Sequence, residues 1–356
     1  MMTHNYKPMT NGDLAFIVII SIVLVLSVLG NLMVLVVMIR TPKLMNATNL
    51  FICNVTVSDI LLAGLVIPQN IHDISHADDN YYEGDFLCRV VNFCPLLCVM
   101  ASIYSMVAIS FERKRAILVS NGARTTSAQA MKIIPLIWCL ALVFCIPSIY
   151  EYSEFQELTV NGSVITRCGN HNVSNLYSTV NGSCILMLAY ILPLSVLLFN
   201  YSCIIGFFRS RGIFNSTSIV SVVNQAMYRS RYNVVKMMIL ISLLFCVSWM
   251  PYFVLLLIEK ITGTSDVTDA ESSVQMLRLA LAVFSTVYNF LLNIIYNRNF
   301  RGGFQKFFVC ARRVARTNTI VPLEPGNTAN LAGSSDIMVT PSAFVLSLQP
   351  RSATLA

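Results

Sequence analysis

The sequence predicts an all-α membrane protein, a bundle of seven transmembrane helices followed by a short amphipathic helix 8. Of its 356 residues, 56% are hydrophobic and only 12% are charged, and the mean hydropathy is +0.68. An ordinary soluble domain has roughly 25% charged residues. Long apolar runs recur along the chain, and at roughly 20 residues per crossing the length allows seven helices with short loops.

The apolar runs set the expected order of elements. The first run, Leu14 to Ile39, is too long for the core of a signal peptide, so we expect it to remain as a helix. The seven helices are expected near residues 14–39, 49–71, 88–117, 131–149, 184–208, 232–258 and 275–296. The domain organisation that follows is an extracellular tail (1–13), the bundle (14–296), the amphipathic helix (297–312) and a disordered cytoplasmic tail (313–356).

Charge is divided unevenly between the two faces that such a bundle would have. If the first helix exits to the cytosol and the faces alternate, the outer face holds 13 acids and 5 bases, and the inner side holds the other 19 bases. Lys/Arg bias fixes orientation, so we expect a multi-pass plasma-membrane protein with an extracellular N-terminus. The basic total is the signature of contact with inner-leaflet lipid and indicates no nucleic-acid partner.

The predicted outer loop 150–181, expected to be extended or irregular, carries three N-glycosylation motifs, which support this orientation because glycosylation occurs in the secretory lumen. The acceptor residues are Asn161, Asn172 and Asn181. Most of the 11 cysteines fall inside apolar runs, but Cys88 and Cys168 fall outside, where a disulfide can form. Cys184 is the competing partner, and Cys310 in the amphipathic helix is a candidate for palmitoylation.

Asp59 is a carboxylate inside an apolar run, and an acid at mid-membrane indicates a functional site. One interpretation is a sodium ion coordinated by Asn31, Asp59, Ser102, Ser285 and Asn289; the other is a polar knot between helices without an ion. Zinc at His72 and His76, one helical turn apart, is less favoured than a solvated pair.

Two further groups of residues suggest a conformational change. Glu112-Arg113 ends the third run, either as ordinary positive-inside anchoring or as a switch in which a locally paired arginine is released toward a partner. Trp249 lies two residues before Pro251, which removes a helical hydrogen bond and kinks the helix. The Trp249 indole either couples ligand contact to a swing of this helix or only packs against its neighbours.

The order of these features resembles the rhodopsin-like (class A) G-protein-coupled receptors over about residues 14–312. The features are Gly30-Asn31, Asp59, Cys88, Glu112-Arg113, Trp138, Cys168, Pro193, Trp249-Met-Pro251 and Phe300-Arg301. The segment from Asn92 to Arg113 is most similar to helix 3 of tachykinin-type neuropeptide receptors. The resemblance implies a Cys88–Cys168 disulfide, an activation switch of Glu112, Arg113, Tyr201, Trp249, Pro251 and Asn289, and a transmission core of Ile103, Pro193 and Phe245.

The chain departs from the family pattern at both ends of the switch. Lys114 stands where a tyrosine usually follows Glu-Arg, and the Asn-Pro-x-x-Tyr motif of helix 7 is degraded. Counting back from Phe300 places its asparagine at Asn289, and an alternative register places it at Asn293. These departures keep open a modulatory or scavenger receptor with weak or no G-protein coupling.

The expected ligand is an extracellular peptide, basic or amidated. Pro95 occupies the position of the amine receptors' aspartate, and no lysine between Lys260 and Lys306 could hold retinal. The acidic outer face favours cationic ligands, although it also suits solubility alone. Pocket candidates by family position are Gln69, Asn92, Phe93, Leu96, Val99, Tyr252, Glu259 and Gln275.

The resemblance implies heterotrimeric G proteins, and arrestin, as inner partners. It implies no catalytic residues and no cofactor other than an allosteric sodium ion. A transporter would need several intramembrane charges or paired broken helices, and only Asp59 qualifies.

Overall fold

The computed structural model describes residues 9–75, 84–119, 125–158, 162, 164–170, 173–210, 219–262, 269–296 and 300–305. Seven of its helical segments are long and apolar enough to cross a membrane, which confirms the predicted fold class. The helices are α1 (Asn11–Arg40), α2 (Ala47–Ser75), α3 (Asp85–Leu118), α4 (Ser127–Glu151), α5 (Asn175–Leu186) continuing through η2 (Met187–Ile191) into α6 (Leu192–Ser210), α7 (Ile219–Thr262) and α8 (Asp269–Tyr296). A short 3-10 helix, η1 (Pro42–Leu44), follows α1, and residues 300–305 are helical.

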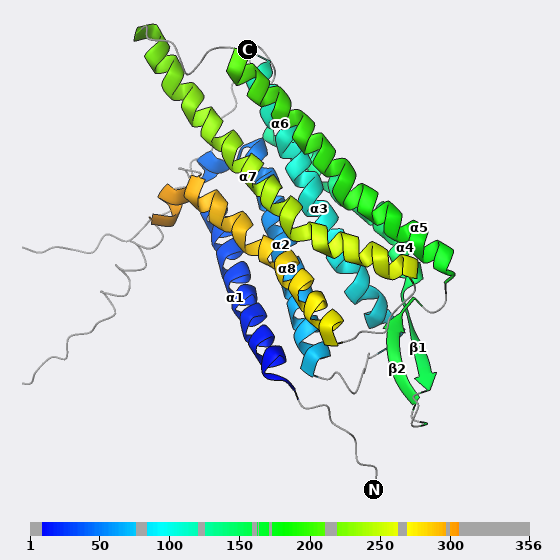
Figure 1. The fold of residues 1–356 in the computed structure, drawn as a ribbon. Helices are drawn as coiled ribbons and strands as arrows, with labels where there is room; N and C mark the ends of the chain where they lie inside the picture. The colour runs from blue at the N-terminus through cyan, green and yellow to red at the C-terminus, as the bar shows by residue number, and fades with distance from the viewer. Residues whose placement is uncertain are drawn as a thin grey trace, which may run out of the picture. The chain divides into compact units, whose positions relative to one another are not determined.

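The bundle has two distinct ends (Figure 1). The start of α1 lies at the same end as a β-hairpin of strands β1 (Ser153–Leu158) and β2 (Val164–Gly169), and we call this the hairpin end. Residues 300–305 lie at the opposite end, which we call the tail end. Helix α3 runs from the hairpin end to the tail end, and α7 runs in the opposite direction.

The helices are longer than the apolar runs that predict them. Helix α1 begins at Asn11 inside the predicted tail 1–13, because Thr10 and Asp13 form a reciprocal capping box. Helix α4 begins at Ser127, where Thr126 and Gln129 do the same. Hydropathy marks only the part of a helix that crosses lipid, while polar caps decide where the helix begins.

The segment 150–181 combines two structures. Antiparallel pairing of β1 with β2, in the register Ser153 opposite Gly169, fits the predicted extended chain. The prediction is wrong for residues 175–181, which form the first turns of α5 behind the capping residue Ser174. Further along, Pro193 has no N–H to donate, and the chain passes through the π-helical segment η2 just before it.

Helices at the centre are joined by polar and close-packed contacts. Asn54 of α2 donates to Ser105 of α3 (2.8 Å) and accepts from the indole of Trp138 on α4 (2.8 Å). Gly30 of α1 lies under the ring of Phe290 on α8; a Cβ at Gly30 would come within 2.4 Å of that ring. Such contacts let helices associate where lipid provides no hydrophobic driving force.

Several predictions concern residues outside the described part of the chain. These are the N-terminal tail before residue 9, the glycosylation sites Asn161 and Asn172, the zinc alternative at His76, the palmitoylation site Cys310, and the tail 313–356.

Candidate functional site

A cavity of about 560 Å³ lies at the hairpin end between α2, α3, α7 and α8. Six predicted pocket residues line it: Gln69, Asn92, Leu96, Val99, Tyr252 and Gln275. Among the described residues, Phe93 and Glu259 lie outside the cavity wall, contrary to the prediction. Phe93 packs partly buried against the core instead.

Glu259 is unsuited to attract a cationic ligand because two side chains of α8 occupy its carboxylate. Arg278 forms an ion pair with it at 2.9 Å, and Gln275 donates to it at 2.5 Å. Sequence position alone gave no sign that the next helix would supply these partners.

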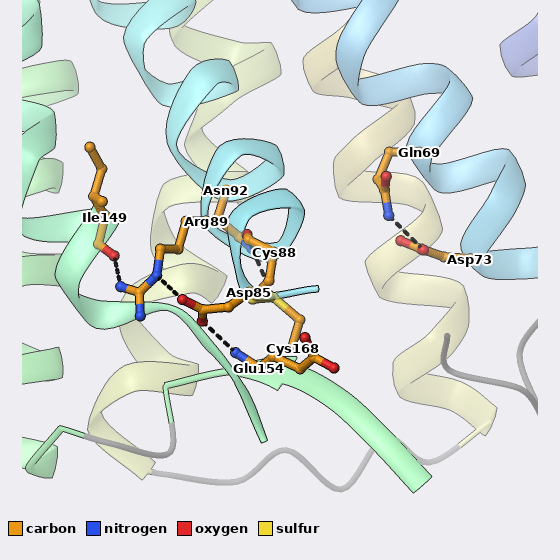
Figure 2. Close-up of a disulfide and its surroundings, with 9 residues drawn as sticks. All are labelled: Gln69, Asp73, Asp85, Cys88, Arg89, Asn92, Ile149, Glu154 and Cys168. Atoms are coloured by element: carbon orange, nitrogen blue, oxygen red, sulfur yellow. Dashed lines mark hydrogen bonds and ion pairs between the residues drawn. A yellow bond between two sulfur atoms is a disulfide. The ribbon is translucent and has the colours of Figure 1, made fainter. Parts of the chain in front are cut away.

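Asp73 is the carboxylate in the wall that the sequence analysis missed. It lies near the hairpin end of α2, its side chain is 42% exposed, and it accepts a hydrogen bond from Gln69 at 2.8 Å (Figure 2). Its position four residues after Gln69, one helical turn along the same face, was a usable signal.

The wall is polar toward the hairpin end and apolar at depth. The polar part includes Gln69, Asn70, Asp73, Asn92, Gln275 and Arg278. Deeper along α7, Trp249 and Phe253 contribute aromatic surface. The indole nitrogen of Trp249 is buried and has no hydrogen-bond partner among the described residues. The cavity therefore offers an apolar floor with one donor and a rim of amides, a carboxylate and a guanidinium.

The predicted disulfide is present, joining Cys88 of α3 to Cys168 of β2 with the two Cα atoms 5.6 Å apart (Figure 2). The alternative partner, Cys184, is a free, exposed thiol. Asn92 of the cavity wall donates to the carbonyl of Cys88 at 2.9 Å. Asp85 also accepts from the backbone N–H of Glu154 at 3.0 Å, so the hairpin is fixed to the beginning of α3 beside the cavity.

Asp59 lies in the middle of the bundle and is 2% exposed. It accepts from the amide of Asn289 at 3.0 Å, whereas Asn293 donates to the Asn289 carbonyl. Asn31 donates to the Thr286 carbonyl at 2.9 Å, and Ser102 and Ser285 are buried on α3 and α8. The side-chain oxygens of Asn31 and Asn289 have no partner among the described residues. An unused amide oxygen on a side chain that contacts a buried carboxylate, as at Asn289, suits a hard cation.

At the tail end, Arg113 is held by its neighbours. It forms an ion pair with Glu112 at 3.0 Å and donates to the hydroxyl of Thr48 on α2. The Thr48 hydroxyl donates in turn to Glu112 at 2.7 Å. Thr48, which was not predicted, therefore links the arginine to a second helix.

Lys114 has a specific contact that its sequence position did not reveal. Its Nζ donates to Asn200 of α6 at 3.1 Å and lies 4.3 Å from the ring centre of Phe199. Asn200 also donates to Ser110 of α3 at 2.9 Å. The lysine thus ties α3 to α6 beside the buried Tyr201. The sequence indicated this contact only through Asn200, a polar residue within an apolar run just before Tyr201.

Aromatic residues connect the cavity floor to the core. Trp249 stacks on Phe245 with ring centres 5.8 Å apart, and both are buried with Ile103. Pro193 is buried on α6, and Pro251 lies inside α7. The stacked pair Trp249 and Phe245 therefore connects the cavity floor to the buried core.

The family model described as 7 transmembrane receptor (rhodopsin family) matches residues 30–292. The chain belongs to this rhodopsin-like family of G-protein-coupled receptors. The receptor is therefore a multi-pass plasma-membrane protein and not an enzyme.

The receptor is similar to named members of this family. It is 28% identical to the human (Homo sapiens) "Substance-P receptor" over 294 residues, covering 82% of this chain and 70% of that receptor. It is 26% identical to "Galanin receptor 2b" of Danio rerio over 327 residues, covering 90% of this chain and 82% of that one. The first agrees with the tachykinin-type resemblance of helix 3.

One predicted modification is incompatible with the fold of the receptor. The side chain of Asn181 is buried, and its amide nitrogen, the atom that would carry a glycan, donates to Glu151 at 2.5 Å and to Ser148 at 3.3 Å. The prediction of Asn181 as a glycosylation site is therefore wrong; its sequon gave no information about burial.

We expect Ser183→Ala to leave the glycan mass of the receptor unchanged. This substitution destroys the sequon of Asn181 but keeps the Asn181 amide in place, since the Ser183 hydroxyl donates to the Thr179 carbonyl of its own helix. The measurement is gel mobility with and without a glycosidase, compared with Asn161→Gln and Asn172→Gln. A loss of one glycan in the Ser183 variant would contradict the burial argument.

Proposed function

We propose that the receptor binds an extracellular peptide with a cationic or amidated end and activates heterotrimeric G proteins. The observation that carries the proposal is the cavity at the hairpin end, with its apolar floor and its rim of amides around Asp73. Amide side chains match peptide groups and a terminal carboxamide, and Asp73 matches a cation. The printed names of the substance-P and galanin receptors support a peptide as the ligand class.

The proposal places the hairpin end outside the cell. The Lys/Arg bias supports this orientation, because Arg113, Lys114 and Arg115 all lie at the tail end of α3. A ligand on the cavity floor would contact Trp249 and shift the bundle between two states. Release of Arg113 from Glu112 and Thr48 would then open a binding surface for a G protein, with arrestin as a competing partner.

The test is guanine-nucleotide exchange on purified G proteins with the receptor in lipid nanodiscs and a peptide library. Stimulation by a basic or amidated peptide is the expected result. Binding of a peptide at surface-expressed receptor without exchange on any G protein would sink the coupling claim. It would favour the modulatory receptor, whose specific support is the Lys114–Asn200 contact between α3 and α6.

We expect Asp73→Asn to weaken binding of a cationic peptide about 10- to 100-fold, since a hydrogen bond to a charged group contributes about 1.5–3 kcal/mol. Competition binding measures the effect. The matched control is Glu154→Gln, which removes an equal charge from the hairpin outside the cavity wall. Equal losses in both variants would show that only the general acidity of this face attracts the peptide.

We further propose that Asp59 and the unused oxygens of Asn31 and Asn289 hold a sodium ion, with Ser102 and Ser285 nearby. Sodium should then raise the melting temperature of the ligand-free receptor relative to N-methylglucamine at equal ionic strength. In the Asp59→Asn variant the difference between the two cations should vanish. A wild-type receptor that does not distinguish the two cations would indicate the polar knot without an ion.

A further inference from the structure

A second polar cluster at the hairpin end lies apart from the cavity and is almost completely buried. Lys260 of α7 forms an ion pair with Glu151, the last residue of α4, and their side chains are 5% and 0% exposed. Ser178 and Asn181 of α5 each donate to the Glu151 carboxylate at 2.5 Å. The cluster therefore joins the hairpin ends of α4, α5 and α7.

The surroundings of Lys260 fit its side chain closely. A Cβ at Gly182 of α5 would come within 2.6 Å of the Lys260 Cδ, so only glycine leaves room for the lysine stem. Thr179 donates to the Lys260 carbonyl at 2.9 Å, which adds a backbone contact between the same helices. The Lys260 Nζ also lies 3.4 Å from the Tyr152 hydroxyl. Burial, followed by the Glu151 charge, raises the pKa of Tyr152, so this hydroxyl stays protonated.

Glu259, the residue before Lys260, contacts a different helix from Lys260. Glu259 contacts Arg278 and Gln275 of α8, and Arg278 lines the cavity. The Glu259–Arg278 pair is partly exposed, with side chains 30% and 14% exposed, whereas the Glu151–Lys260 pair is not. A ligand can therefore reach the first pair and leave the second intact.

We infer that the Glu151–Lys260 cluster is a fixed pivot for α7, so that displacement of Trp249 by a ligand moves the tail end of α7 and not its hairpin end. This role rests on the proposed receptor function. Breaking a buried ion pair on one side leaves a costly unpaired charge, so a cluster of this kind holds its helices in one arrangement. Glu151 and Lys260 act here as positioning residues and do not touch the ligand.

The experiment distinguishes a role of the cluster in activation from a contribution to folding stability alone. Lys260→Met leaves Glu151 unpaired and should lower the melting temperature. The double variant Glu151→Gln/Lys260→Met removes both charges at nearly constant volume and should recover much of that loss. Maximal exchange at saturating peptide should nevertheless stay reduced by at least about fivefold in the double variant, with peptide affinity unchanged. Recovery of stability together with full exchange would overturn the pivot.

The matched control neutralises another carboxylate at the same end. Glu154→Gln removes the charge of a β1 residue three positions after Glu151, keeps its backbone N–H bond to Asp85, and should leave maximal exchange unchanged. An equal loss in this control would also overturn the inference.

A readout without a G protein keeps the inference testable if the proposed function fails. Spin labels on unnatural amino acids at Tyr150 and Ile261, which are 67% and 59% exposed, report the distance between α4 and α7. We expect one narrow distribution in the wild type and a broader one in the Glu151→Gln/Lys260→Met variant. Identical distributions would reject the pivot, whereas absence of exchange in the wild type would reject only the receptor's coupling.

Discussion

Replacing Arg113 with alanine is expected to reduce peptide-stimulated nucleotide exchange on the order of 100-fold while peptide binding persists, because the cavity lies at the opposite end of the bundle. Exchange and competition binding on the same nanodisc preparation measure the two quantities. Undiminished exchange in this variant would show that Arg113 is not part of the activation switch.

The companion variant Thr48→Val should have the opposite effect. It keeps the shape of the side chain but removes the hydroxyl that contacts both Arg113 and Glu112. A hydrogen bond to a charged group contributes about 1.5–3 kcal/mol, so we expect basal exchange to rise about tenfold. Lower basal exchange with Thr48→Val would mean that the contact supports the active state.

Replacing Cys168 with serine is expected to abolish most surface expression of the receptor. The bond links residues 80 apart in sequence, and loss of a native disulfide typically costs about 2–5 kcal/mol. The hairpin would also lose its covalent attachment beside Asn92, so the remaining receptor should bind peptide weakly. Flow cytometry and radioligand binding on intact cells measure both effects.

Two controls accompany this variant. Cys184→Ser should behave as wild type, because that thiol is free and exposed. Cys88→Ser/Cys168→Ser should be no worse than either single variant, since all three lack the same bond. Normal expression of Cys168→Ser would show that the hairpin is held by its hydrogen bonds alone.

The seven-helix architecture follows from the sequence because apolar length alone decides which segments cross a membrane. Helix ends follow less well, since Thr10 and Thr126 extend their helices through capping that hydropathy does not report. The disulfide follows from the family order of motifs, and the choice of Cys168 over Cys184 agrees with the structure.

Side-chain partners across helices were the part that could not be predicted. Glu259 fitted the expected pocket by position, yet Arg278 occupies its carboxylate. Asn181 fitted a sequon, yet its amide is buried against Glu151. In both cases the deciding neighbour lies on another helix, at a distance in sequence that no local pattern encodes.

The contact between Gly30 and Phe290 bears on how this receptor could diversify. In the register that places the motif asparagine at Asn289, Phe290 takes the position of the motif's proline. Its ring fills the space that a side chain at position 30 would need. A larger residue on α1 is therefore tolerated only with a smaller one on α8, so the two positions are expected to change together in descendants of this chain.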